Sequence, residues 1–166
     1  MNIISLQVIA VLIQVYIANT KKVVNVMLAT FLFNVLTMLC YLYIDDITTV
    51  YMYILIIIRS FIYIFKDKLE KYNFIPLGFI IIQLVVGFIT IENFFNIISI
   101  LVPCYTIYYM WYYKTTQKLR VGNIISNGLW GVYNAIIGLY IIMVARIITV
   151  IVNIIVYVKN MRGSEA

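Results

Sequence analysis

Seven apolar runs, separated by short polar or charged segments, limit what this chain can fold into. Each run has about 18–22 residues, close to the length at which an α-helix crosses the hydrocarbon core of a bilayer. Isolated strands cannot cross lipid, so the runs are predicted to be helices. The seven runs are Ile3–Thr20, Val23–Ile44, Ile47–Phe65, Phe74–Ile91, Phe94–Tyr113, Val121–Tyr140 and Ile141–Val158.

The composition agrees with an all-α integral membrane protein. Of the 166 residues, 65% are hydrophobic and 11% are charged, whereas about a quarter of the residues in a soluble domain are charged. The formal net charge of +6 does not indicate a nucleic-acid partner, because the Lys and Arg residues fall mostly in short loops between the runs. The expected partner is therefore the lipid bilayer, and a homo-oligomer is compatible with the sequence.

The sequence contains no histidine, and its two cysteines, Cys40 and Cys104, lie within apolar runs. We expect both cysteines to be reduced and packed as small apolar groups, with no metal site and no cofactor. All six acidic residues lie in loops or in the tail, so no general base is expected inside the bundle. The chain is therefore not expected to be an enzyme.

The basic residues outside the runs lie on one side of a seven-span topology. Ten Lys and Arg residues fall in the loops and tail of that side, and none falls on the other. Because basic loops stay in the cytoplasm, the N-terminus is predicted outside the cell membrane and the C-terminus in the cytoplasm. Fusing the last two runs would place Lys159 and Arg162 outside, so a tight turn is predicted at Gly138–Leu139–Tyr140.

The order of helices and loops is doubled along the chain. Residues 22–66 and 120–159 each contain a basic loop, a helix with a polar stripe, a short non-basic turn, a second helix and a basic end. Equivalent helices are four spans apart, so the two copies are predicted to be parallel repeats, as in sugar-type transporters. The predicted parts are a first three-helix repeat (1–66), a linking helix (67–92), a second three-helix repeat (93–158) and a cytoplasmic tail (159–166).

Polar residues recur at helical spacing in the last two runs. Amides and a guanidinium are costly in hydrocarbon, so these residues are expected to face the interior of the bundle. There they either line a solute site or form interhelical hydrogen bonds that hold the bundle together, and the sequence leaves both readings open. One face consists of Asn123, Asn127, Trp130, Asn134 and Gly138, and the other of Arg146, Thr149 and Asn153.

A solute site is predicted around Trp130 and Asn134, which are one turn apart in the middle to outer half of the sixth span. The indole ring can stack on a flat polar solute, and the amide both donates and accepts hydrogen bonds. The alternative is that Trp130 packs against lipid or a neighbouring helix. Asn34, near the middle of the second span, is predicted to face Asn134 across the axis that relates the repeats.

Two arginines lie within the predicted spans. Arg146 is predicted to pair with Asp45 or Asp46 at the outer face, or else to bind an anionic group of a solute. Arg59 and Asn153 form a second, deeper pair, in which Arg59 is expected to extend its charged head toward the cytoplasmic interface.

Two positions are candidate hinges. Pro103 lies on a stepped polar face of the fifth run with Asn96, Ser99 and Thr106, and it frees a backbone carbonyl. It is predicted to act as a hinge or as a static kink. Gly138, in the turn between the last two runs, is the second candidate.

Several segments of the C-terminal half resemble the YgjV-type bacterial inner-membrane proteins: Leu101–Val102–Pro103, LWGVYN with Trp130 and Asn134, Gly138, and Asn153 in IVNIIVYVKN. The three-plus-one-plus-three layout resembles the broader group of SWEET and PnuC transporters. The resemblance implies the fold more firmly than the function. Tyr133 and Arg146 stand where a histidine and an acid are expected, which argues against proton coupling through these positions.

Together these features predict a transporter or facilitator of a small polar solute, passive or ion-coupled, with its site between the two helix triplets. The chain has no glycine-rich nucleotide loop and no soluble domain for ATP use. The alternative is a membrane interaction protein in which the polar stripes only hold the bundle together. A substrate-binding subunit of a vitamin importer is a third reading, but six spans would be expected there.

Overall fold

The computed structural model describes residues 3–19, 23–63, 65, 69, 72, 74–113 and 115–163. Seven helices lie within these residues, and none of the described residues is in a strand, which agrees with the predicted all-α class. The helices are α1 (Ile3–Asn19), α2 (Val23–Tyr43), α3 (Ile47–Tyr63), α5 (Phe74–Thr90), α6 (Asn96–Tyr112), α7 (Thr116–Ile136) and α8 (Tyr140–Gly163).

Each helix falls on one predicted run, and the largest differences are in the last two. Helix α7 begins at Thr116 rather than Val121, because Thr115 caps it and accepts a hydrogen bond from the Lys118 N–H at 3.4 Å. Helix α8 continues to Gly163, so it extends beyond the predicted end of the seventh run.

The predicted break between the last two helices lies at Gly138. Its φ of +79° is a left-handed conformation that glycine adopts at little cost. The Leu139 N–H then donates to the Asn134 carbonyl at 2.9 Å, which satisfies one of the last carbonyls of α7. The alternative of one long helix is thereby excluded.

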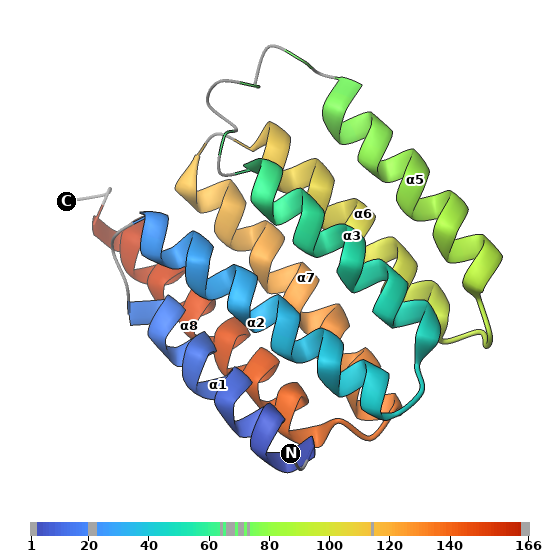
Figure 1. Ribbon diagram of the computed structural model, residues 1–166. Helices are drawn as coiled ribbons and strands as arrows, with labels where there is room; N and C mark the ends of the chain where they lie inside the picture. The colour runs from blue at the N-terminus through green and yellow to red at the C-terminus, as the bar shows by residue number, and fades with distance from the viewer. Residues whose placement is uncertain are drawn as a thin grey trace.

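Six of the helices form a ring in the order α1, α2, α3, α6, α7 and α8, with α8 packed against α1. Helix α5 lies outside this ring against α3 and α6 (Figure 1). The α2–α3, α5–α6 and α7–α8 links lie at one end of the bundle, and the C-terminus lies at the other (Figure 1). The described helices thus run alternately up and down.

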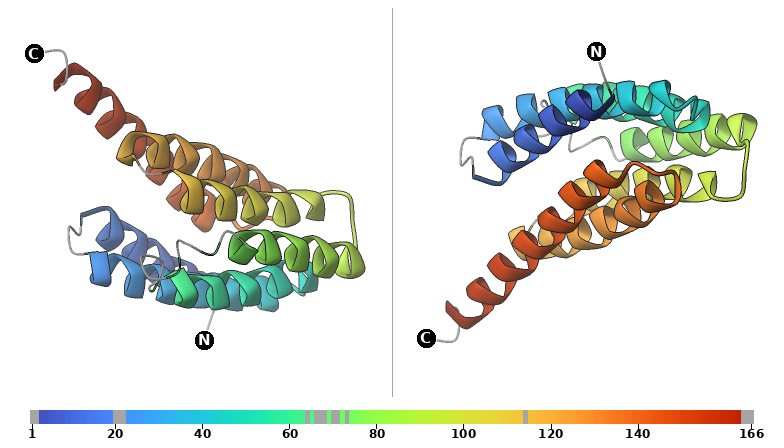
Figure 2. Two further views of the ribbon diagram at one scale, coloured as in Figure 1. Left: turned by 90° about the horizontal axis from the view of Figure 1, so that it is seen from above. Right: turned by 90° about the horizontal axis from the view of Figure 1, so that it is seen from below.

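The ring is made of two layers, one of α1, α2 and α3 and the other of α6, α7 and α8. Figure 2 shows that these layers are close together at the end that holds the α7–α8 turn and diverge toward the end that holds the C-terminus. Several fully buried side chains are polar, among them Thr37, Asn96 and Asn134.

The outward faces of the helices are apolar, with large side chains such as Leu12, Phe61 and Phe88 more than half exposed. Within α8, the segment Tyr140–Lys159 has a mean hydropathy of 2.6 and is long enough to cross a bilayer. Four further segments of the described residues are apolar but shorter. Most of the lysines in the basic loops lie outside the described residues.

The contact of α5 with α6 depends on Gly87. A Cβ atom at this position would lie 2.6–2.9 Å from side-chain atoms of Ile100, whereas a Cβ at Gly78 on the same helix would meet no atom within 4 Å. Gly87→Ala is therefore expected to destabilise the protein by about 1–3 kcal/mol through overpacking. Gly78→Ala should be neutral or stabilising, because alanine favours the helix. Equal thermal unfolding of the two variants in detergent would show that α5 does not pack closely on α6.

Candidate functional site

A polar cavity of about 150 Å³ lies between the two layers. Side chains of α2, α3, α6, α7 and α8 line it. Of the six predicted binding residues, Asn134 and Asn153 are not among those that line the cavity. The polar or charged side chains that line it are Thr30, Asn34, Tyr53, Arg59, Ser60, Thr106, Tyr109, Ser126, Asn127, Trp130 and Arg146.

The Arg146 side chain crosses from α8 into the interior of the bundle, where the residue is 7% exposed. Its Nη1 donates to Asn127 Oδ1 at 2.9 Å, and its Nη2 donates to the Tyr53 hydroxyl at 3.0 Å. The guanidinium carbon also lies 4.7 Å from the centre of the Phe33 ring. The predicted pairing with Asp45 or Asp46 is therefore wrong. Depth along the membrane suggested those partners, but the rotation of α8 directs Arg146 toward α3 and α7.

Arg59 is also buried, at 5% exposure, so the expectation that it extends to the cytoplasmic interface is wrong. Its Nη1 donates to the Pro103 carbonyl at 3.4 Å, and its guanidinium carbon lies 5.7 Å from the centre of the Tyr63 ring. The contact joins α3 of one layer to α6 of the other. Arg59 therefore belongs to the cavity wall, although it was not predicted as a binding residue.

Trp130 points into the bundle, so the reading in which it faces lipid is not supported. Its ring packs against the rings of Tyr41, Tyr53 and Tyr133, with centroid separations of 5.4–6.2 Å. It also lines the cavity, and the Arg146 guanidinium carbon lies 5.9 Å from its ring centre. Trp130 thus contacts both the aromatic core and the polar space.

The predicted pairing of Asn34 with Asn134 is not found. Asn34 Nδ2 donates to the Ser60 hydroxyl at 3.5 Å, and Asn34 lines the cavity. Asn134 is fully buried, accepts a hydrogen bond from the Tyr41 hydroxyl at 2.9 Å and donates to the Trp130 carbonyl at 2.6 Å. The two amides therefore have separate roles, because the α2 residue opposite Asn134 is Tyr41, about two turns beyond Asn34.

The remaining predicted residues lie at or beyond the edge of the site. Asn153 Nδ2 donates to the Thr149 carbonyl within α8 at 2.8 Å and does not line the cavity. It is therefore not paired with Arg59. Pro103 lies inside α6 and lines the cavity, so a change of bend at Pro103 would alter the cavity wall. Gly138 follows the end of α7, far along the chain from Asn127, and it does not line the cavity.

A hydrogen-bond network that was not predicted closes the end of the bundle near the α2–α3 turn. The Tyr133 hydroxyl donates to Asp46 Oδ2 at 2.5 Å and contacts the Thr49 hydroxyl at 2.8 Å. Asn96 Nδ2 lies 3.0 Å from Asp46 Oδ1 and 3.1 Å from the Tyr133 hydroxyl. Tyr133 follows Trp130 by three residues and so lies near it on α7, which is the sequence signal that could have identified it.

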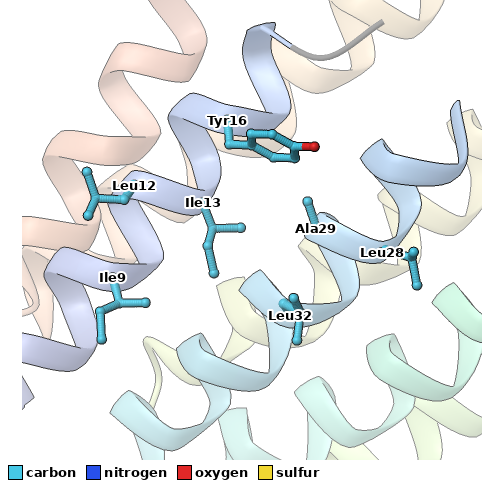
Figure 3. Close-up of a pocket in the computed structure, with 7 residues that line it drawn as sticks. All are labelled: Ile9, Leu12, Ile13, Tyr16, Leu28, Ala29 and Leu32. Carbon is cyan, nitrogen blue, oxygen red and sulfur yellow. The ribbon is translucent and has the colours of Figure 1, made fainter. Parts of the chain in front are cut away.

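Two further hollows among the described residues are apolar. The larger, of about 420 Å³, lies between α1 and α2, where Figure 3 shows Tyr16 extending from α1 toward Ala29 of α2. The smaller, of about 260 Å³, lies along α7 and α8. Such surfaces suit lipid chains rather than a polar solute. The described residues contain no group of three or more His, Cys, Asp or Glu side chains that could hold a metal ion.

Tyr133→Phe tests the network. The variant removes the hydroxyl that contacts Asp46, Thr49 and Asn96, and leaves a buried amide and a carboxylate short of a partner. We expect it to lose about 1–3 kcal/mol of unfolding free energy. Tyr140→Phe is the control, because Tyr140 is 63% exposed. Unchanged stability of Tyr133→Phe would contradict a structural role for this network.

Comparison with known proteins identifies a family. A family model described as bacterial inner membrane protein, Imp-YgjV, matches residues 2–164. No curated protein and no solved structure matches the chain. The matched range includes all the described helices, from α1 to α8, and it agrees with the resemblance noted in the C-terminal segments. The chain belongs to the Imp-YgjV family of bacterial inner membrane proteins.

Proposed function

We propose that this protein is a seven-span transporter or facilitator of a small polar solute, and that the cavity between the two layers is its solute site. The observation that carries the proposal is the cavity itself, in which two arginines, two asparagines, two serines and two threonines line one space inside the bundle. Polar groups at this depth are costly unless they have hydrogen-bond partners, and in transporters they mark the path of the solute.

The spacing of the helices supports a parallel repeat. Helices α6, α7 and α8 begin at Asn96, Thr116 and Tyr140, each 93 residues after the start of α1, α2 and α3 respectively. The same spacing relates the ends of α1 and α6 and the ends of α2 and α7. It also relates Asp45 and Gly138, the two residues with positive φ among those described. By this register, Asn34 corresponds to Asn127, and both line the cavity.

Contacts between equivalent residues support the same arrangement. Residues on a two-fold axis meet their own equivalents, and two hydrogen bonds across the layers have this property. The Tyr41–Asn134 and Tyr53–Arg146 bonds each join residues 93 apart in sequence. The packing of α3 against α6 likewise corresponds to the packing of α8 against α1. We therefore place the axis between the layers, along the membrane normal, as in the SWEET-type layout.

The direction of access follows from the charge pattern, which assigns the end with the C-terminus to the cytoplasm. On the outer side of Trp130, the Tyr41–Asn134 and Tyr133–Asp46 hydrogen bonds join the layers. On the cytoplasmic side the layers diverge (Figure 2). We infer an inward-facing state, and exchange to the outward-facing state would require these two bonds to break. Pro103 and Gly138 remain the proposed hinges.

The competing reading, in which polar residues only hold the bundle together, applies to Asn134. Its amide is fully buried and bonded on both sides, so Asn134→Leu is a stability variant rather than a binding variant. Asn34, Ser60 and Asn127 also form hydrogen bonds between helices, from Asn34 to Ser60 and from Arg146 to Asn127, but unlike Asn134 they line the cavity. Their position favours a binding role.

Filling the cavity tests the site without removing a buried hydrogen bond of the aromatic core. Ser60→Leu places a bulky side chain in about 150 Å³ of space. A thermal-shift screen of sugars, nucleosides, vitamins, amino acids and small carboxylates should identify a solute that stabilises the wild-type protein. Ser60→Leu is expected to lose that stabilisation, because the solute no longer fits.

Gly128→Leu is the matched control for Ser60→Leu. It adds bulk on α7, where a Cβ would meet no atom within 4 Å, and Gly128 lies outside the polar cavity. This variant should keep the ligand-induced shift. A shift of equal size in both variants would place the solute elsewhere, and the absence of any stabilising solute would contradict the proposed function.

Cysteine labelling tests the topology. In a variant without Cys40 and Cys104, a single cysteine replaces Glu92 or Lys118, both of which are exposed. An impermeant thiol reagent applied outside the cell is expected to label Glu92→Cys and not Lys118→Cys, because the basic side of the bundle faces the cytoplasm. Labelling of Lys118→Cys from outside would reverse the orientation.

A further inference from the structure

We infer that the solute carries a carboxylate or phosphate group and that Arg59 and Arg146 bind it. This inference rests on the proposed function and adds the chemical class of the solute. Both guanidinium groups belong to the wall of one small cavity, and both residues are more than nine-tenths buried. Their arrangement brings two positive charges to one space between the layers.

Neither guanidinium has an anionic hydrogen-bond partner among the described residues. Arg146 donates to an amide oxygen and a phenol, and Arg59 donates to a backbone carbonyl. The Nε–H group of each arginine is buried and has no hydrogen-bond partner. Both side chains therefore retain unused donors in the region of the cavity.

Among the described acidic residues, Asp46 makes its hydrogen bonds outside the cavity. Asp46 accepts hydrogen bonds from Tyr133 and Asn96 and from the Thr49 N–H in the outer network. None of the described residues that line the cavity is Asp or Glu. Two buried cations without a counter-charge are unfavourable, and an anionic solute would neutralise them where it binds.

The geometry of the groups limits the solute further. Guanidinium is the side chain best suited to planar, bidentate binding of carboxylate and phosphate. A cavity of about 150 Å³ holds a molecule of roughly benzene's size. Ser60, Asn34 and Asn127 add uncharged donors and acceptors for a hydroxyl or amide of the same solute. A short carboxylic acid or a small phosphate compound meets these conditions.

Thermal stabilisation of the full chain in a maltoside detergent, which has neither carboxylate nor phosphate, tests this inference. The probes are succinate and inorganic phosphate, and succinamide is the uncharged match for succinate. At least one anion is expected to stabilise the protein, and succinamide is not. Arg59→Gln should weaken binding of that anion by about tenfold or more. Arg59 is chosen because Arg146 also bonds to Tyr53 and Asn127.

Two further variants show whether a loss of binding comes from the charge at position 59, from a change in net charge, or from misfolding. Arg59→Lys should bind better than Arg59→Gln but worse than the wild type, because the charge remains while the planar fork is lost. Lys118→Gln removes an exposed positive charge of α7 outside the cavity and should bind normally. Normal affinity in Arg59→Gln would overturn the inference.

The remaining outcomes distinguish this inference from the proposed function. If succinamide or another neutral solute stabilises the protein and the anions do not, the cavity is a solute site but the assignment of an anion is wrong. If phosphatidylglycerol stabilises the protein and neither soluble anion does, the arginines bind a lipid head group and the inference also fails. If no soluble compound of either class stabilises the protein, the proposed function fails with it.

Discussion

Polar contacts cross between the two helix layers at several points. Arg59 of α3 reaches the Pro103 carbonyl of α6, and Arg146 of α8 reaches the Tyr53 hydroxyl of α3. In a lipid-facing protein the driving force for helix association is small, because lipid chains are as apolar as leucine. Hydrogen bonds between layers therefore decide how the layers are oriented.

This interface differs between its two ends. Toward the α7–α8 turn, Tyr133, Asp46 and Asn96 satisfy one another, and the rings of Tyr41 and Trp130 fill the remaining space. Toward the C-terminus the layers diverge (Figure 2), and the polar groups line a cavity there, although Arg59 and Tyr63 of α3 still bond to backbone carbonyls of α6. This difference between the two ends supports the proposed inward-facing state, and the proposed repeat would allow the opposite state to form with similar packing.

The sequence predicted the helices well because their signal is local. Runs of about 20 apolar residues and the glycine at position 138 were enough to place the spans and the last turn. The inward direction of Trp130 and Asn127 followed from helical spacing, since it depends only on residues of α7. Thr115 was missed as a helix cap because the residues after it, up to Arg120, were assigned to a basic loop.

The contacts between helices were predicted less well, because they depend on the rotation of each helix and on the order of helices around the ring. The expected depth in the membrane gave Asp45 and Asp46 as partners of Arg146. The order of helices around the bundle instead places Tyr53 and Asn127 beside it. The pairing of Asn34 with Asn134 was wrong by seven residues, about two turns along α7. The spacing of 93 residues, which is visible only once the helix ends are known, relates Asn34 to Asn127 instead.

The most direct test of a hydrated solute site is the accessibility of a cysteine placed in it. In a protein without Cys40 and Cys104, Ser60→Cys can be treated with a small impermeant anionic methanethiosulfonate in right-side-out and inverted membrane vesicles. We predict that the reagent reacts in inverted vesicles and not from the outside, and that it reacts faster than its cationic counterpart because Arg59 lies in the same cavity wall. A cysteine that reacts only after denaturation would mean that the cavity is dry, and it would contradict the proposal of a solute site between the layers.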